Sequence, residues 1–142
     1  MPYDTKLCSD IAESAVATEL LKRGFRVLRP IGDRLPYDLA IDQGHRLLRI
    51  QVKSAWYDSA KGLYTVDARR TKTNRRRMLR APYRRKDFDF AVLYLPDQTV
   101  CYIMPIAVFA AYRSGISFVE GQKRQRKPRS WRYRERWDLL TG

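Results

Sequence analysis

Two short segments of the chain alternate between apolar and polar side chains. Residues 47–53 place apolar side chains at every second position from Leu48, and residues 37–42 form a second alternating run. A period of two predicts strands that bury one face. Gln43-Gly44 lies between the two runs, and glycine tolerates the positive φ that a tight hairpin turn requires. We therefore predict an antiparallel hairpin over residues 37–53.

This hairpin predicts a polar cluster on one face of its sheet. With a two-residue turn at Gln43-Gly44, Asp38 lies opposite Arg49, and opposed side chains of an antiparallel pair share a face. Gln51 and Lys53 follow Arg49 at intervals of two and lie on the same face. A three-residue loop would break this parity. The opposite face then carries the apolar side chains Leu39, Ile41, Leu48, Ile50 and Val52.

The remaining pattern predicts one long helix before the hairpin and further strands after it. Residues 4–23 form the helix, with Asp4 as N-cap and Gly24 at the C′ position. The strand that begins at residue 47 is expected to run on to residue 56 or 57. The other predicted elements are strands at 25–29, 63–67, 88–95, 100–104 and 116–119, a short helix at 106–112 and a last helix from Ser130 to Leu140.

Glu13 differs from the other interior acid of the first helix. Glu19 has Lys22 and Arg23 three and four residues further on, which is the spacing of helical ion pairs. Glu13 has Val16 and Ala17 at those positions and no basic residue three or four positions before it. An acid with apolar neighbours and no local partner is a candidate metal ligand or catalytic group.

Composition narrows the classes of partner. The 142 residues suit one domain, and 29 basic against 15 acidic side chains give a formal charge of +14. Such an excess favours a polyanion, either nucleic acid or an anionic membrane surface. Because the chain has no apolar run of membrane-spanning length and no signal-peptide pattern, membrane association is the weaker interpretation. We expect a cytoplasmic, nucleoid-associated protein that is encoded by a bacterium, a phage or a mobile element. The two distant cysteines and the single histidine favour a reducing compartment and argue against zinc.

The basic side chains concentrate in two segments, residues 69–86 and 121–129. A run this dense is usually solvated and often mobile, and its functional interpretation is contact with DNA phosphates, with Tyr83 interleaved. Residues 63–67 and 72–75 could also enter the major groove. For the aromatic side chains of Trp131, Tyr133 and Trp137, core or subunit packing is favoured over base stacking. The candidate DNA-binding residues are Arg69, Arg70, Lys72, Asn74, Arg75, Arg76, Arg77, Arg80, Lys123, Arg124 and Arg126.

Four side chains are candidates for phosphodiester chemistry: Glu13, Asp38, Gln51 and Lys53. Oxygen ligands suit Mg²⁺, which usually takes one or two carboxylates and keeps several waters. Asp38, Gln51 and Glu13 could supply such oxygens, and Lys53 could hold the attacking water or stabilise charge at the phosphate. Each residue alone is better explained as part of a solvated hairpin face. All four together, in a chain this basic, favour a nuclease site.

These residues and their order resemble the PD-(D/E)XK nuclease superfamily. Glu13 on the first helix, Pro36-Tyr37-Asp38 and Gln51-Val52-Lys53 match its catalytic positions, and the core would cover about residues 5–112. The neutral Gln51, Ser54 and the strand pair near Phe88–Val92 and Tyr102–Ile106 are most similar to the homing endonucleases encoded in group I introns.

The resemblance implies an α/β (α+β) fold with a restriction-endonuclease-like αβββαβ core, in which helices flank a mixed central sheet. It also implies cleavage of double-stranded DNA with Mg²⁺, for which Mn²⁺ would substitute, by a homodimer or homotetramer. Residues 113–142 would add a basic loop and a helix to this single nuclease domain.

Two departures from the family pattern bear on the chemistry. Tyr37 separates Pro36 from Asp38, although the aspartate is the chemically necessary part. Gln51 stands where most of the superfamily has an acid, so we expect weaker metal binding and a less certain two-metal mechanism. A Holliday-junction resolvase, a restriction-type nuclease and a non-catalytic nucleic-acid-binding module remain as alternatives.

Overall fold

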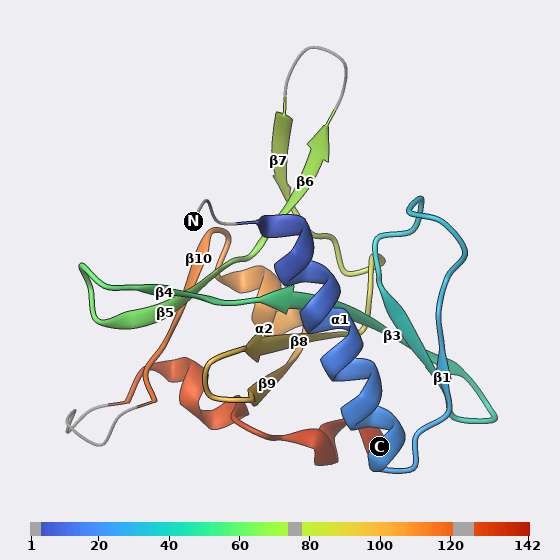
Figure 1. Cartoon of the computed structure of the whole chain (residues 1–142). Helices are drawn as coiled ribbons and strands as arrows, with labels where there is room; N and C mark the ends of the chain where they lie inside the picture. The colour runs from blue at the N-terminus through green and yellow to red at the C-terminus, as the bar shows by residue number, and fades with distance from the viewer. Residues whose placement is uncertain (1–3, 74–77, 121–126) are drawn as a thin grey trace.

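The computed structural model describes residues 4–73, 78–120 and 127–142, and for the strands that flank residues 74–77 it describes the backbone pairing (Figure 1). The elements, in chain order, are α1 (Thr5–Lys22), β1 (Val27–Leu28), β2 (Leu39–Asp42), β3 (Leu47–Ser54), β4 (Trp56–Asp58), β5 (Leu63–Asp67), β6 (Arg69–Thr73), β7 (Met78–Pro82), β8 (Phe90–Leu95), β9 (Val100–Pro105), α2 (Ile106–Ala111), β10 (Gly115–Phe118) and the 3₁₀ helices η1 (Arg129–Tyr133) and η2 (Trp137–Thr141).

A mixed five-stranded sheet organises the molecule, in the order β1-β2-β3-β8-β9. Strands β3 and β8 run parallel, and the other neighbouring pairs are antiparallel. The α/β fold class with a mixed central sheet is therefore confirmed. The order of elements differs from αβββαβ, because the crossover from β3 to the parallel β8 runs through strands β4–β7 and α2 follows β9. A parallel pair needs a long crossover, which is usually but not always a helix.

The hairpin of β2 and β3 has a longer turn than predicted but the predicted faces. Asp42 pairs with Leu47, and the Gln43 N–H donates to the Arg46 carbonyl at 3.0 Å, so four residues form the turn. The register is shifted by two residues from the expected one, so that Arg49 pairs with Ala40 and not with Asp38. A shift of two leaves each side chain on its original face, whereas a shift of one would have reversed them all.

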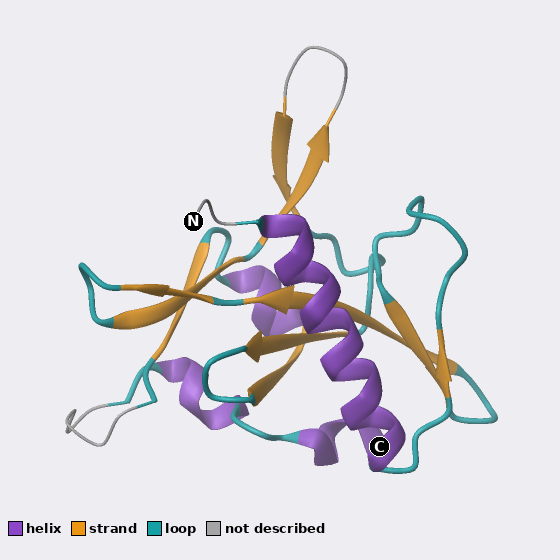
Figure 2. Cartoon of the chain, in the orientation of Figure 1, coloured by secondary structure: helices purple, strands orange, loops and turns teal. Residues whose placement is uncertain are grey.

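Helix α1 covers one face of the central sheet, as Figures 1 and 2 show. Its N-cap is the predicted Asp4, whose Oδ1 accepts a hydrogen bond from the Leu7 N–H at 3.0 Å. The helix buries Ala12, Val16 and Leu20 against the apolar face of the hairpin. A second core lies on the opposite face and includes side chains of β5, β10 and α2. No helix in the described part of the chain is long and apolar enough to cross a membrane.

The strand predicted to continue past residue 54 is interrupted. Strand β3 ends at Ser54, and β4 begins at Trp56 in a separate sheet with the order β10-β5-β4. Ala55, between them, is buried, and its N–H donates to the Tyr94 carbonyl at 2.8 Å. This bond continues the parallel ladder between β3 and β8 by one rung, and the chain enters the second sheet directly after it.

The basic segment 69–86 is more ordered than its composition suggested. Its backbone forms the hairpin β6–β7, which projects from the body of the molecule beside the start of α1 (Figure 1). Arg69 pairs with Pro82 at the base of this hairpin. Tyr83, expected among solvated arginines, is instead buried against Phe88 and Phe109. Arg84, Arg85 and Lys86, which follow Tyr83, are exposed, as the composition suggested.

The prediction of a helix from Ser130 to Leu140 was wrong. Two 3₁₀ helices, η1 and η2, take its place, and Arg134 between them has extended φ and ψ. Arg134 forms a β-bridge with Tyr102 of β9, which draws the chain out of helical geometry. The hydroxyl of Ser130 donates to the Ser117 carbonyl at 2.6 Å instead of capping a helix. Trp137 is buried in the α1-side core, as favoured for it over base stacking.

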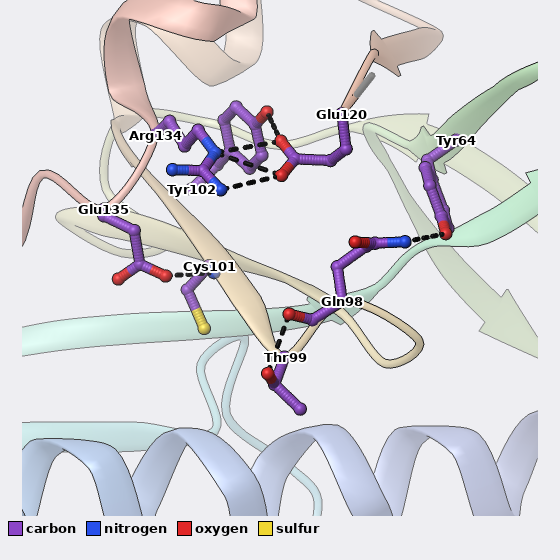
Figure 3. Close-up of polar contacts among 8 residues, drawn as sticks. All are labelled: Tyr64, Gln98, Thr99, Cys101, Tyr102, Glu120, Arg134 and Glu135. Carbon is purple, nitrogen blue, oxygen red and sulfur yellow. Dashed lines mark hydrogen bonds and ion pairs between the residues drawn. The ribbon is translucent and has the colours of Figure 1, made fainter. Parts of the chain in front are cut away.

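The carboxylate of Glu120 anchors this terminal segment to β9 (Figure 3). Its side chain is 7 % exposed, accepts from the Tyr102 hydroxyl, and receives two N–H groups of Arg134 at 2.9 and 3.0 Å. Burial and the bond to Glu120 both raise the pKa of Tyr102, which therefore stays a neutral donor. Removing the carboxylate would leave buried donors without an acceptor.

We expect Glu120→Ala to lower the free energy of unfolding by about 2–3 kcal/mol, the usual cost of unpairing buried polar groups. Urea denaturation followed by circular dichroism measures this loss. Asp138→Ala is the matched control, because Asp138 also pairs with an arginine, Arg136, but its side chain is 62 % exposed. Exposed ion pairs contribute little, so this control should unfold like the wild type. Equal losses in both variants would contradict an anchoring role for Glu120.

Candidate active site

A cavity of about 270 Å³ brings the four candidate catalytic residues together. Helix α1 supplies Glu13, the residue before β2 is Asp38, and β3 supplies Gln51 and Lys53. Asp38, Gln51 and Lys53 reach it from the polar face of the hairpin, and Glu13 reaches it from the helix over the other face. The cavity is lined by Thr5, Cys8, Ser9, Glu13, Asp38, Gln51, Val52, Lys53, Ser54, Trp56, Val66 and Asp67.

Asp38 is held by the backbone of β3. Its N–H donates to the Ile50 carbonyl at 2.9 Å, and its Oδ2 accepts from the Val52 N–H at 2.9 Å. Burial raises the pKa of this carboxyl, and the Val52 N–H and the Lys53 charge oppose the rise. These two bonds orient the carboxylate into the cavity before any ligand arrives.

Glu13 lies within electrostatic reach of Asp38. Burial raises the pKa of Glu13 first, the charge of Asp38 adds to the rise, and Arg29 opposes it. The Nε of Arg29 lies 3.4 Å from Oε1 of Glu13, and the Glu13 side chain is 29 % exposed. The sequence offered no local partner for this acid, and tertiary structure supplies a distant one. Glu13 thus faces Asp38 on one side and an exposed arginine on the other.

Gln51 and Lys53 occupy successive inward positions of β3. The Nε2 of Gln51 donates to the Val52 carbonyl at 3.3 Å, and among the described residues no hydrogen bond engages its Oε1. The Nζ of Lys53 donates to the Arg69 carbonyl at 3.2 Å and lies 5.1 Å from the centre of the Tyr83 ring. The ammonium also lowers the pKa of Asp38. A positive group, an amide and two carboxylates therefore surround one space.

The oxygen atoms of these side chains fit a hard divalent cation, and the one supplied by Gln51 is uncharged. Besides Asp67, whose carboxylate is paired with Arg69, two carboxylates and an amide oxygen line the cavity, which matches the oxygen ligands of Mg²⁺. The charge of Asp38 raises the pKa of Glu13, and a bound cation would relieve this repulsion. Within residues 4–73, 78–120 and 127–142, no three His, Cys, Asp or Glu side chains group closely enough to hold a metal ion. Gln51 takes the place of the missing third acid.

The raised pKa of Asp38 predicts a stability effect in the absence of metal. A folded pKa above the ordinary 3.8 means that the fold disfavours the charged form. This cost is absent below pH 3.8 and grows as the pH rises through the folded pKa. We expect metal-free Asp38→Asn to melt at a higher temperature than the wild type at pH 7, with a difference that shrinks as the pH falls.

Thermal unfolding in EDTA across this pH range measures the effect. Excess Mg²⁺ should favour the wild type instead, because binding to the native state stabilises it. Equal melting temperatures in EDTA at neutral pH would contradict the burial cost of the Asp38 charge.

The structure describes only part of the predicted DNA-binding set. The side chain of Arg69 is committed to Asp67, with its Nε and Nη2 at 3.0 and 3.2 Å from the two carboxylate oxygens. Arg70, Lys72 and Arg80 lie on the paired backbone of β6–β7. The other residues of this set lie outside the described residues: Asn74, Arg75, Arg76, Arg77, Lys123, Arg124 and Arg126. Arg69 therefore stabilises the base of the hairpin through its ion pair with Asp67, a role that its place in a basic run did not indicate.

Sequence reasoning missed several cavity residues. Asp67 ends β5, and its strand position alone does not distinguish it from a surface acid. Ser54 follows Lys53, and its buried Oγ has no hydrogen-bond partner among the described residues. Such an atom at the wall of a polar cavity suits a water or ligand contact. No local signal marks Thr5 or Ser9, which reach the cavity only because α1 crosses the end of β3.

Comparison with known proteins identifies similar solved structures. A solved structure titled "The structure of a bacterial homing endonuclease: I-Ssp6803I" aligns with a TM-score of 0.90 and 52 % identity, over 98 % of this chain and 94 % of that chain. The crystal structure of MepB aligns with a TM-score of 0.48 and 12 % identity, over 90 % of this chain and 93 % of that one, a likeness too slight to support an argument. A search of the curated proteins returned no match.

The family assignment rests on nearly the whole sequence. The profile of the PD-(D/E)XK endonucleases matches residues 3–140, which include the helix, the hairpin and the terminal segment. Endonucleases of this family generally use divalent metal ions, in agreement with the oxygen ligands around the cavity. The chain belongs to the PD-(D/E)XK endonuclease family and is a DNA endonuclease.

Proposed function

We propose that this chain is a Mg²⁺-dependent homing endonuclease that cuts both strands of a specific DNA site. The observation that carries this function is the shared cavity, in which α1 and the β2–β3 hairpin assemble Glu13, Asp38, Gln51 and Lys53. The 52 % identity to the bacterial homing endonuclease I-Ssp6803I supports the homing type over a resolvase or a restriction enzyme. The whole chain then acts as one nuclease domain.

Asp38, Glu13 and Gln51 would hold the cation through their side-chain oxygens. A bound Mg²⁺ polarises a phosphate oxygen and lowers the pKa of a neighbouring water, and Mn²⁺ would substitute for it. Asp38 contributes a carboxylate that the Val52 N–H already orients. Gln51 contributes an oxygen without charge, which makes the site weaker for metal than one with three acids.

Lys53 supplies the positive charge on the reacting side of the cavity. Its ammonium lies on the same sheet face as Gln51 and interacts with the Asp38 carboxylate. From there it holds the attacking water or stabilises the charge that develops on the phosphate. A preorganised cation in a partly enclosed site is effective for this purpose, because it needs no reorientation during the reaction.

DNA contacts would fall to the two basic segments, residues 69–86 and 121–129. The β6–β7 hairpin projects from the body of the molecule, and its lysines and arginines would follow the phosphates. The net charge of +14 supports binding of a DNA duplex that extends beyond the cavity. Two active sites, one for each strand, suit the cleavage of both strands, so we propose a homodimer or homotetramer as the working form.

Incubation with a plasmid library tests this function. The full chain is mixed with the library in Mg²⁺, Mn²⁺ or EDTA, and the DNA ends are mapped by sequencing. Homing activity gives a double-strand break at one extended site in both metals and none in EDTA. Breaks at a short site would point to a restriction enzyme, and breaks only at branched DNA would point to a resolvase. Salt-dependent binding without breaks in any metal would identify a non-catalytic binding module.

A further inference from the structure

The ammonium of Lys53 lies at the base of the β6–β7 hairpin and contacts both of its legs. The Arg69 carbonyl, at the first residue of β6, accepts from Nζ at 3.2 Å. Tyr83 directly follows the last residue of β7, and the centre of its ring is 5.1 Å from Nζ. Arg69 pairs with Pro82, so the two contacts bracket the final rung of the hairpin.

Both groups that contact the ammonium rest on rigid supports. Tyr83 is 7 % exposed, and its ring meets Phe88 edge-on at 5.0 Å and Phe109 at 5.9 Å. Arg69 is braced by Asp67, which accepts from its backbone N–H at 2.9 Å and from its guanidinium. The hairpin base therefore holds its position relative to the core while the arms extend outward.

A lysine side chain needs such supports to act at a defined point. Its four-carbon stem is flexible, and its charge is a compact point with three rotatable donors. An aromatic face within about 6 Å attracts the ammonium without using any of these donors. The Arg69 carbonyl takes one donor, which fixes the direction of approach. Together the ring and the carbonyl restrict Nζ to one side of the cavity.

We propose that Tyr83 is a positioning residue for Lys53, and that the base of the β6–β7 hairpin ties the catalytic ammonium to the DNA-binding arm. This role rests on the proposed nuclease function. Tyr83 itself touches neither DNA nor the reacting atoms, because its ring is buried. Its place in a basic run suggested contact with nucleic acid, and the structure turns it toward the lysine instead.

Three variants separate the aromatic face from general packing. Tyr83→Leu keeps an apolar side chain and removes the ring, and Tyr83→Phe keeps the ring and removes the hydroxyl. Tyr64→Leu is the matched control, since Tyr64 is also 7 % exposed and belongs to the same core cluster. Although residues 63–67 were expected to be able to enter the major groove, the ring of Tyr64 is buried and cannot read bases there. Thermal unfolding verifies that each variant is folded at the assay temperature.

Single-turnover cleavage with enzyme in excess gives the catalytic consequence. We expect Tyr83→Leu to slow cleavage roughly tenfold or more, the scale of loss for a misplaced reacting group. Tyr83→Phe and Tyr64→Leu should cleave at the wild-type rate. The Kd for DNA, measured in Ca²⁺ to prevent cleavage, should change less than about twofold in all three variants. A wild-type rate for Tyr83→Leu, or an equal slowing of Tyr64→Leu, overturns the positioning role.

A spectroscopic readout tests the contact without relying on activity. In protein labelled with ¹³C-lysine, the Hε–Cε signal of Lys53 is assigned by its absence from Lys53→Arg. A ring face near the ammonium shifts this signal upfield, and Tyr83→Leu should remove the shift while Tyr83→Phe keeps it. A signal unaffected by Tyr83→Leu overturns the placement. If the wild type cleaves no DNA, the nuclease function fails, and this signal still decides where Lys53 lies.

Discussion

Asp38→Asn is expected to lower metal-dependent cleavage by roughly 10³-fold or more, because a cation at the reacting phosphate is worth several kcal/mol and each 1.4 kcal/mol is about tenfold in rate. The substitution keeps the shape of the side chain and an oxygen that can accept the Val52 N–H. It removes the charge of the carboxylate best placed to hold the ion. Single-turnover cleavage in saturating Mg²⁺ measures the loss.

The result is specific only if DNA binding and folding are preserved. The Kd in Ca²⁺ should stay close to the wild-type value, because the proposed contacts with DNA lie on the basic segments. Asp42→Asn is the matched control at the last residue of β2, the strand that Asp38 directly precedes. Its Oδ1 accepts from the Gly44 N–H at 2.8 Å, outside the cavity, so its cleavage rate should match the wild type. Equal activity of Asp38→Asn and the wild type would remove Asp38 from the metal site.

Lys53→Met is the second large effect, with an expected loss of roughly 10²–10³-fold in the cleavage rate, as for the removal of one group that stabilises charge in a transition state. Methionine keeps most of the apolar stem and removes the ammonium. Raising the Mg²⁺ concentration should not restore the rate, because the metal ligands are intact. Single-turnover cleavage over a range of Mg²⁺ concentrations makes this distinction.

Lys61→Met serves as the control for the loss of one positive charge. Lys61 lies exposed in the turn between β4 and β5 and does not line the cavity. It should cleave like the wild type. Recovery of Lys53→Met at high Mg²⁺ would indicate that Lys53 acts on metal affinity rather than on the reaction. Cleavage that survives both Asp38→Asn and Lys53→Met would place the chemistry elsewhere in the chain.

The neutral side chain of Gln51 increases the expected importance of the two candidate carboxylates. Because Gln51 is neutral, Asp38 and Glu13 carry the whole negative charge of the candidate ligand set, and each should matter more than in a site with three acids. Arg29 lies on the outer side of Glu13 and competes for its carboxylate. Glu13 therefore has two partners available, the cation within the cavity and the arginine outside it.

Local patterns in the sequence were enough to predict α1 and the β2–β3 hairpin. The Asp4 cap and the alternation of residues 47–53 depend on neighbours within a few positions, so they can be read without the rest of the fold. The face that carries Asp38, Gln51 and Lys53 was predicted with the wrong turn, and it survived because the register error was two residues. The sheet face on which a side chain lies is therefore easier to predict than the residue with which it pairs.

Tertiary contacts decided the features that the patterns could not. Arg134 leaves helical geometry because it pairs with Tyr102, and Glu13 gains a partner in Arg29, sixteen positions further along the chain. Both contacts join segments whose sequences give no sign of each other. The basic run concealed a hairpin in the same way, since charge density describes solvation and not strand pairing.

The sequence by itself determined which residues could perform the chemistry: two carboxylates, an amide and a lysine, in the order typical of the family. Only the tertiary structure decided that they line one cavity and that Lys53 rests on Arg69 and Tyr83. The physical reason is that side-chain type and alternation are local properties. The meeting of α1, β3 and the base of the β6–β7 hairpin depends on packing across the whole chain.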